Sequence, residues 1–207
     1  MLVNLSVKEF LAKTAGSDPV PGGGSISALN AAIASALAEM VANLTIGRKK
    51  YEDKEELMKE IASVAAHYQT GFIKDIDADS DAYNQVFDAF KLPKETDTEK
   101  AERSKQIQAA TKIAAEVPME VARKAFALMD FIARVAEEGN QNAITDACVS
   151  MMTARTAVLG AILNVRINLT SIKDEEYVKL MTEEVNHLER EAISKEEELL
   201  KKVKQIF

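Results

Sequence analysis

The stretch PGGGSISALNAAIASALAEMVANLTIG, residues 21–47, decides the fold. It predicts a helix over about 26–46, with Ser25 as its N-cap and Gly47 as its stop. Alanine and serine leave much of the surface of this segment small, and larger apolar side chains recur between them. A helix whose surface is small or apolar nearly all round is normally buried. We therefore expect this helix at the centre of the molecule, packed against several neighbours.

The segments on either side of this helix carry apolar residues at three- and four-residue steps, the spacing of one helical face. They predict further helices over residues 6–15, 54–90, 99–138, 143–169 and 174–207. The S-x-x-E pattern at Ser6 is typical of a capping box, and Pro118 should bend its helix. The sequence therefore predicts an all-α fold, a single domain over residues 1–207 built as a bundle of about six helices, several of them long.

The composition excludes several classes of protein. The chain has 207 residues, 47% of them hydrophobic, with 31 alanines but only 8 glycines and 4 prolines. That composition rules out a disordered chain and favours helices. A formal net charge of −7 argues against a nucleic-acid partner. The lone Cys148 excludes an internal disulfide, and neither a long apolar run nor a signal sequence is present, so we expect a cytoplasmic protein with no membrane partner.

Three polar islands interrupt the apolar helices, and the first is the turn Gly22-Gly23-Gly24-Ser25 before the central helix. Consecutive glycines let backbone amides converge, and a helix N-terminus has partial positive charge, so the turn suits a carboxylate or a phosphate. The turn is not a Walker A loop, because the Gly-Lys-Ser/Thr ending is missing. A flexible turn with a serine cap explains the same residues equally well.

The second island is an acidic run with Asp75, Asp77, Asp79 and Asp81 at every second position. A calcium loop is excluded, because Ser80 stands where such a loop needs glycine. A solvated acidic face is the ordinary explanation for such a run. The apolar residues of the same helix favour a second explanation, a catalytic role. A carboxylate turned toward them would have a raised pKa and could serve as a general acid or base.

The third island, GNQNAITD, contains Asn140, Asn142 and Asp146. Either asparagine could cap the following helix, and the aspartate could complement its dipole. That explanation accounts less well for so many polar residues beside a very apolar helix. Lys49 and Lys50 follow the central helix, where cations either complement the dipole or hold an anionic ligand.

Together these segments resemble a known family. The stretch PVPGGGSISALNAAIASALAEMVANLTIGRKKY, the acidic DADSDAYNQV and the later GNQNAITDA are similar, in order, to motifs of the formiminotransferase-cyclodeaminase C-terminal domain family. That family includes stand-alone methenyltetrahydrofolate cyclohydrolases. The likeness covers nearly the whole chain, with Thr145 where serine is commoner. No segment resembles a formiminotransferase domain, so transfer of the formimino group is not expected.

The resemblance implies an all-helical, dimer-forming enzyme of folate one-carbon metabolism. We expect a formimidoyltetrahydrofolate cyclodeaminase, which yields 5,10-methenyltetrahydrofolate and ammonia, with 5,10-methenyltetrahydrofolate cyclohydrolase as the alternative. No residue separates the two reactions, and the family name favours the first. A non-catalytic folate-binding or structural helical protein is the alternative of another class. The substrate would be a tetrahydrofolate derivative, with no metal and no permanently bound cofactor.

The resemblance also implies roles for the polar residues. Asp79 or Asp81, together with Asp146, would transfer the protons of the reaction. Asn140 and Asn142 would hydrogen-bond the pterin or the reacting amidine. Which aspartate is the acid and which is the base stays open.

A homodimer is expected because the long terminal helices carry apolar rows that one six-helix domain need not cover on both sides, and the length of the central helix suggests a site that uses both subunits. The amides of residues 22–25 should hold the carboxylates of the glutamate tail, yet Lys49 and Lys50 lie past the other end, about 30 Å away at 1.5 Å per residue. We expect the lysines of one subunit to complete the site of the other. Apolar rows on the last helix would pack on the core or on a partner, and Lys195 and Lys202 break a full coiled-coil seam there.

Overall fold

The computed structural model describes residues 1–206 and contains six α-helices. They are α1 (Val7–Thr14), α2 (Gly23–Asn43), α3 (Glu55–Phe90), α4 (Asp97–Glu138), α5 (Ile144–Leu169) and α6 (Glu175–Val203). Short 3-10 helices cover Leu2–Asn4, Lys49–Lys54 and Gln141–Ala143, and the described range holds no strand. The predicted all-α, single-domain bundle of about six helices is confirmed.

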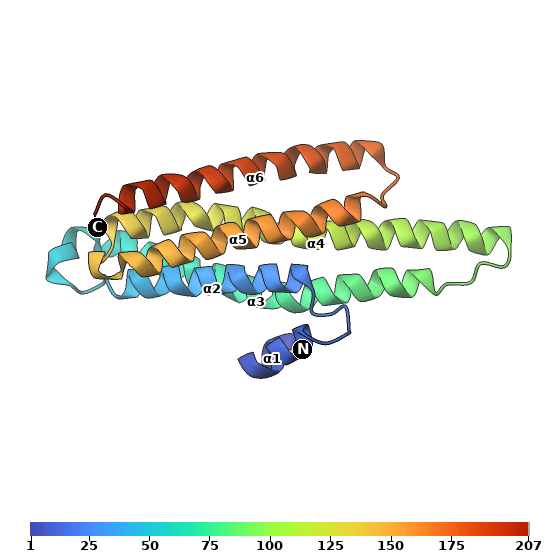
Figure 1. The fold of residues 1–207 in the computed structure, drawn as a ribbon, viewed down its shortest axis with the longest axis horizontal. Helices are drawn as coiled ribbons and strands as arrows, with labels where there is room; N and C mark the ends of the chain where they lie inside the picture. Colours follow the sequence, from blue (N-terminus) through green and yellow to red (C-terminus); the bar gives the residue numbers. More distant parts are fainter. Residues whose placement is uncertain (207) are drawn as a thin grey trace.

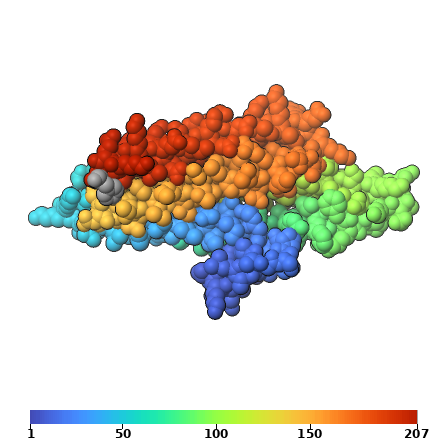
Figure 2. Space-filling view, in the orientation of Figure 1, coloured from blue at the N-terminus to red at the C-terminus, as the bar shows by residue number. Residues whose placement is uncertain are grey.

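Helices α2 to α5 form the core of the bundle, and α6 packs along α4 and α5. Figure 1 shows α2 and α5 side by side on the near face, with α3 and α4 behind them. The hairpin of α3 and α4 extends beyond the ends of the other helices, while α1 lies apart from the bundle. The space-filling view shows the same near face, where no other element covers most of α2 and α5 (Figure 2).

Helix α2 is buried because its small side chains let the neighbouring backbones approach. Ala28, Ala31, Ala34 and Ala38 have no exposed surface. The approach is close enough for the Ser150 hydroxyl of α5 to donate to the carbonyl of Ala34 at 2.7 Å. The prediction of a central helix packed on several neighbours is confirmed.

Two segments are long and apolar enough to cross a membrane by length and composition alone. They are α2 and residues Gln141–Leu169, each with a mean hydropathy of 1.4. About half of each is buried inside the bundle, 56% for the first and 50% for the second. Helices at the centre of a core need the same composition, so their burial accounts for their hydropathy.

The first turn of α2 differs from the sequence prediction. The helix begins at Gly23, with Gly22 at the N-cap in an extended conformation, so Ser25 is not the N-cap. Ser25 lies inside the first turn, fully buried, and bonds to α3. The helix ends at Asn43, and Gly47 closes the following turn with φ at 74°. The N-terminus of α2 differs from the prediction because the hydrogen-bond partner of Ser25 lies on α3, and a local sequence pattern does not reveal such a partner.

Helix α4 continues through Pro118 as one helix. Proline has no N–H, so the carbonyl of Ala114, one turn earlier, loses its usual helical donor. The side-chain amide of Asn168 in α5 donates to that carbonyl at 3.0 Å. A hydrogen bond between helices thus replaces the one that proline removes.

Helix α6 packs one apolar face on the bundle of its own chain. Its buried residues include Met181, Val185, Leu188, Ala192, Leu199 and Val203. Lys195 and Lys202, which break the heptad pattern, pair with Asp130 and Glu137 of α4. The two lysines therefore lie at the edge of the contact, where each meets a carboxylate, and the expectation of an amphipathic packing helix is confirmed.

Candidate functional site

Asp79 of α3 is held against the N-terminus of α2. The backbone N–H of Ser25 donates to Oδ2 of Asp79 at 2.8 Å. Gly24 permits this approach, because a Cβ at Gly24 would collide with the carboxylate. The second oxygen, Oδ1, accepts no hydrogen bond from residues 1–206. The glycine turn is therefore built around a carboxyl group of the chain itself, with one anchored oxygen and one free oxygen.

The hydrogen bonding of the Ser25 hydroxyl depends on whether Asp79 is protonated. Its oxygen lies 2.9 Å from the carbonyl of Ile76 and 3.1 Å from Oδ2 of Asp79, but a hydroxyl has only one proton to donate. When that proton points to Ile76, the contact with Asp79 is a hydrogen bond only if Asp79 is protonated. Burial raises the pKa of Asp79, and the bonds from Ser25 oppose this rise without cancelling it. The surroundings thus favour a carboxyl group that can hold a proton.

A cavity of about 340 Å³ opens beside Asp79, between the glycine turn, α3 and α5. Its polar lining comes from Asp79, Tyr83, Asn164 and Asn168, and the backbone of residues 22–24 forms another wall. Asp81, two residues along α3, is exposed and does not line this cavity. The structure therefore places Asp79, but not Asp81, together with the glycine turn.

Asn164 and Asn168 were not predicted as site residues from the sequence. They lie four residues apart in α5, on the helical face that meets the glycine turn. A Cβ at Gly23 would come within 3.0 Å of the Asn164 amide nitrogen. The only signal in the sequence is two asparagines at a one-turn spacing in an otherwise apolar helix.

The third polar island lies at the opposite end of α2 and α5. Asn140 is buried, and its backbone N–H donates to the Thr45 hydroxyl at 2.8 Å. Its side-chain amide donates to the carbonyl of Leu44 at 3.1 Å and accepts from the N–H of Asn142 at 3.1 Å. These bonds tie the start of α5 to the end of α2, so Asn140 has a structural role. Asn142 itself is exposed, and Asp146 is half-buried.

The basic turn after α2 lies beside this island. Lys49 and Lys50 are exposed, and a shallow cleft of about 320 Å³ includes Lys49 in its lining. The hydroxyl of Tyr51 accepts the backbone N–H of Gln141 at 3.1 Å. This bond, helped by Lys50, lowers the pKa of Tyr51. The second end of the bundle thus brings exposed lysines beside the amide-rich third island, and Arg48, Glu52 and Glu55 complete the lining of its cleft.

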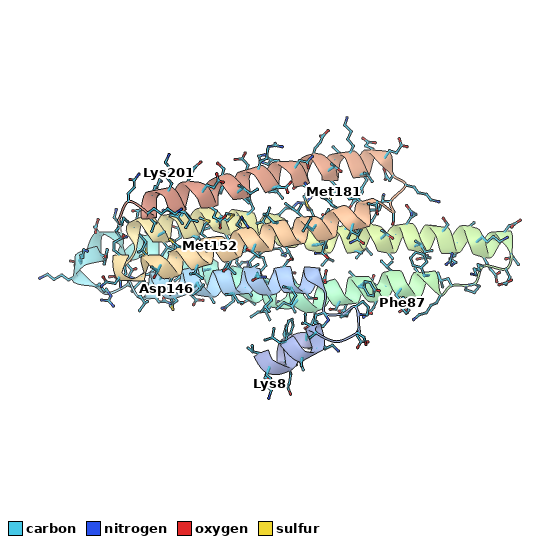
Figure 3. The ribbon with its side chains drawn as sticks, in the orientation of Figure 1. Lys8, Phe87, Asp146, Met152, Met181 and Lys201 are labelled. Atoms are coloured by element: carbon cyan, nitrogen blue, oxygen red, sulfur yellow. The ribbon has the colours of Figure 1, made fainter. Side chains whose placement is uncertain are left out.

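One protomer keeps the two predicted catalytic carboxyl groups apart. Ser150 bonds to Ala34, so Asp146, one turn earlier in the antiparallel α5, lies near Ala38 of α2. From Ser25, which holds Asp79, to Ala38 is about 20 Å along the helix. Figure 3 shows Asp146 near one end of the bundle, far from the end that carries the glycine turn. Within one chain, Asp79 and Asp146 cannot act on the same atom.

Other reactive side chains form no site in the part of the chain that the structure describes. Cys148 is buried, and burial raises the pKa of its thiol. His187 packs edge-on against Phe126. Within residues 1–206, no three His, Cys, Asp or Glu side chains are placed to hold a metal ion.

Proteins of known function resemble this chain in both sequence and structure. The chain is 37% identical to a methenyltetrahydrofolate cyclohydrolase of Methylorubrum extorquens, over 99% of this chain and 98% of that protein. It is 32% identical to the formimidoyltransferase-cyclodeaminase of Gallus gallus, of which it spans 35%. A crystal structure of formiminotetrahydrofolate cyclodeaminase from Thermotoga maritima superimposes with a TM-score of 0.89 at 32% identity, covering 100% of this chain and 99% of that one. The formiminotransferase-cyclodeaminase profile matches residues 6–187, and the chain therefore belongs to that family.

Proposed function

We propose that the protein catalyses the cyclodeamination of 5-formimidoyltetrahydrofolate. In this reaction N10 of folate attacks the amidine carbon held on N5, a ring closes, and ammonia leaves as 5,10-methenyltetrahydrofolate forms. The intermediate is a tetrahedral carbon between two ring nitrogens, and its formation and collapse require proton transfer. The observation that carries the proposal is the half-buried Asp79, which lines a cavity and has a raised pKa and one oxygen with no hydrogen-bond donor among residues 1–206.

The charge of the substrate fits this carboxyl group. An amidine enters as a cation, so moving one proton from N10 to the leaving nitrogen balances the reaction, giving the methenyl cation and ammonia. Oδ1 of ionised Asp79 can accept the N10 proton and return it to the leaving amine. A carboxylate beside a cationic reaction centre also stabilises its charge, and more strongly in a partly dehydrated site than in water.

The negative charge of Asp79 changes where we expect the glutamate tail of folate to bind. The sequence suggested that the amides of residues 22–25 hold the tail carboxylates, but Asp79 occupies that helix N-terminus. A substrate carboxylate placed there would meet a like charge. We therefore assign the tail to Lys49 and Lys50, which are exposed cations at the other end.

Hydrolysis of 5,10-methenyltetrahydrofolate is the second candidate reaction. The full-length likeness to the cyclohydrolase of Methylorubrum extorquens supports it as well as the cyclodeaminase relatives support the first. Water adds to the methenyl carbon, and the ring opens through the same kind of tetrahedral carbon. Asp79 would then accept a proton from water and protonate the leaving ring nitrogen, and the remaining hydroxyl proton is released to solvent as the formyl C=O forms.

A homodimer completes the proposed site. The exposed apolar residues of the two near helices form what we call the α2–α5 face. Its members are Ile33, Met40, Leu44, Val149, Met152, Leu163 and Ile167. A two-fold axis that crosses these helices near their midpoint would pair this face with itself and exchange its ends. Asp79 of one subunit would then lie near Asp146 and the lysines of the other.

The assay that tests the proposal supplies 5-formimidoyltetrahydrofolate and 5,10-methenyltetrahydrofolate separately to the purified protein. Ammonia release from the first supports cyclodeamination, and loss of the methenyl absorbance of the second supports hydrolysis. Tight folate binding without turnover would identify a non-catalytic carrier. Absence of both binding and turnover would identify a structural helical protein and overturn the proposal.

A further inference from the structure

We infer that the cavity beside Asp79 binds the pterin ring of folate by its N–H edge, with the side-chain oxygens of Asn164 and Asn168 as acceptors. The identity of the ligand rests on the proposed function, but the polarity of the cavity does not. The polarity of the cavity follows from the hydrogen bonds that the side-chain amides of Asn164 and Asn168 donate.

The orientation of Asn164 is fixed by a backbone carbonyl. Its Nδ2 lies 2.8 Å from the carbonyl oxygen of Gly160, and a carbonyl can only accept a hydrogen bond. The amide nitrogen must therefore point one hydrogen at Gly160, which fixes which end of the amide is Oδ1 and leaves Oδ1 and the second hydrogen unpaired within residues 1–206. Oδ1 accepts no hydrogen bond from residues 1–206 and lies 3.4 Å from where a Cβ on Gly23 would sit. Because Gly23 has no side chain, this oxygen stays accessible from the glycine turn.

Asn168 is oriented in the same way, by two carbonyls. Its Nδ2 donates to the carbonyl of Ala114 at 3.0 Å and to that of Asn164 at 2.8 Å, so both amide hydrogens are used. The first carbonyl is available because Pro118 lacks the N–H that would otherwise bond to it. Pro118 of α4 thus helps to fix the orientation of the Asn168 side chain in α5. The Asn168 side-chain oxygen accepts no hydrogen bond from the described residues.

Three side-chain oxygens of this cavity consequently lack a donor, while the second amide hydrogen of Asn164 and the Tyr83 hydroxyl are the side-chain donors of its lining. Oδ1 of Asp79, Oδ1 of Asn164 and Oδ1 of Asn168 belong to residues of its lining, and none has a donor within residues 1–206. A ligand that satisfies them must bring N–H groups. The pterin ring does so with its 2-amino group and its N3–H and N8–H. The glutamate tail ends in carboxylates, which are acceptors and would be repelled.

The size and walls of the cavity agree with a ring. A volume of about 340 Å³ stands at the low end of ligand pockets, which span about 300–1,000 Å³, so it suits one ring system rather than a whole folate. Val20, Val86 and Ile167 supply apolar surface, and Tyr83 adds an aromatic ring. Flat heterocycles bind well where apolar walls sandwich them and polar groups meet their edge.

The test measures the two halves of folate separately on the full-length protein. A tetrahydropterin without the benzoylglutamate tail and p-aminobenzoylglutamate are titrated anaerobically by calorimetry. Asn164→Ala and Asn168→Ala should each weaken binding of the pterin half about tenfold, the scale of one lost hydrogen bond to a dehydrated donor. Binding of the tail half should not change. Asn186→Ala, an exposed asparagine of α6, is the control and should change neither.

Asn164→Asp separates a donor ligand from an acceptor ligand. The substitution keeps an acceptor oxygen toward the cavity and adds negative charge, so binding of the pterin half should recover relative to Asn164→Ala. If the cavity held the tail instead, Asn164→Asp would weaken the tail half further. Thermal melting of each variant shows that the bundle remains folded.

The outcomes distinguish this inference from the proposed function. Turnover of folate substrates, with pterin binding that Asn164→Ala and Asn168→Ala leave unchanged, overturns the inference alone. Weaker binding of the tail half in the same variants also overturns it. Absence of folate binding and turnover in the unmodified protein overturns the proposed function itself.

Discussion

At the residue scale, Asp79 experiences two opposing influences. Burial disfavours its charged form, whereas the N–H of Ser25 at the start of α2 stabilises it. The first influence prevails, so the pKa is raised toward the range in which a carboxyl group both takes and gives a proton near neutral pH. Asp81, two residues further along α3, is exposed and does not line the cavity.

Asp79→Asn should lower turnover by roughly 100-fold or more, the usual scale of general acid–base catalysis. Asparagine keeps the shape of the side chain and can still accept the Ser25 N–H, so folate binding should persist. Asp81→Asn is the matched control, because it removes a carboxylate two residues away that is exposed. Steady-state kinetics of both variants decide the matter, and equal losses would remove Asp79 from the mechanism.

The same variant should reveal the cost of burying the carboxylate. Because the folded-state pKa is raised, the group's stabilising contribution is complete below the usual value of 3.8 and is lost as the pH rises through the folded-state pKa. Asp79→Asn cannot ionise, so at neutral pH its melting temperature should equal or exceed that of the unmodified protein. The difference should shrink as the pH falls toward 3.8. A variant that melts lower at pH 7 would contradict the raised pKa.

Gly23→Val should weaken folate binding more than it lowers the melting temperature. Gly23 is exposed, but a Cβ there would lie 3.0 Å from the Asn164 amide and would narrow the cavity. Gly71→Val provides the control, since a Cβ at Gly71 meets nothing within 4 Å. Titration of folate and thermal melting of both variants separate the effects. If Gly23→Val unfolds the protein with no separate binding defect, the turn is purely structural.

The sequence identified most parts of this site but not how they join. The glycine turn and the acidic run each stood out, yet the bond between Ser25 and Asp79 spans 54 positions, and local patterns do not encode such pairs. For the same reason, Ser25 was predicted as a cap and Asp81 was ranked with Asp79. Asn164 and Asn168 matched no motif, because their role comes from carbonyls on neighbouring turns and on α4.

At the element scale, Pro118 shows how a local cost can serve a distant group. Proline within a helix is unfavourable by about 3 kcal/mol relative to alanine, and it leaves the Ala114 carbonyl to Asn168. Helix periodicity predicted the extent of α4 well, because a long apolar repeat outweighs one breaker. Pro118 itself predicted a bend, but the sequence could not show that a side chain of α5 would supply the missing hydrogen-bond donor.

Pro118→Ala should raise KM for the folate substrate several-fold while α4 remains helical. The new N–H would compete for the Ala114 carbonyl and release Asn168 from its fixed orientation. Because a structural defect alone could also lower kcat, both constants are needed, together with the helical signal in circular dichroism. An unchanged KM would mean that the bond between Asn168 and Asn164 is sufficient to orient the amide.

At the scale of the whole molecule, the α2–α5 face should form the subunit interface. Met152→Glu places a charge at the middle of that face, where burial against a second copy would be costly, and should convert a dimer of about 45 kDa to the 22.7 kDa monomer. Figure 3 shows Met152 on α5, away from the ends of the bundle. Leu180→Glu is the control, since Leu180 is also apolar and exposed but lies on α6. Light scattering at micromolar concentration measures both, and a dimer that survives Met152→Glu would place the interface elsewhere.

The last prediction asks whether one active site draws on two subunits. Asp79 and Asp146 lie beside positions of α2 that are about 20 Å apart along the helix, so both can serve one substrate only across an interface. Asp79→Asn and Asp146→Asn should each lose most of their activity alone. Refolded together in equal amounts, half of the dimers would be mixed, and each mixed dimer would hold one site with both aspartates intact. Activity should return to about a quarter of that of the unmodified protein.

No recovery in the mixture, with mixed dimers verified by affinity tags, would contradict a shared site. Unchanged activity of Asp146→Asn alone would remove Asp146 from the mechanism and leave Asp79 as the proton-transfer group. A shared site would explain why the apolar α2–α5 face runs between the two polar ends, because the contact that buries this face also brings Asp79 of one subunit near Asp146 and the lysines of the other.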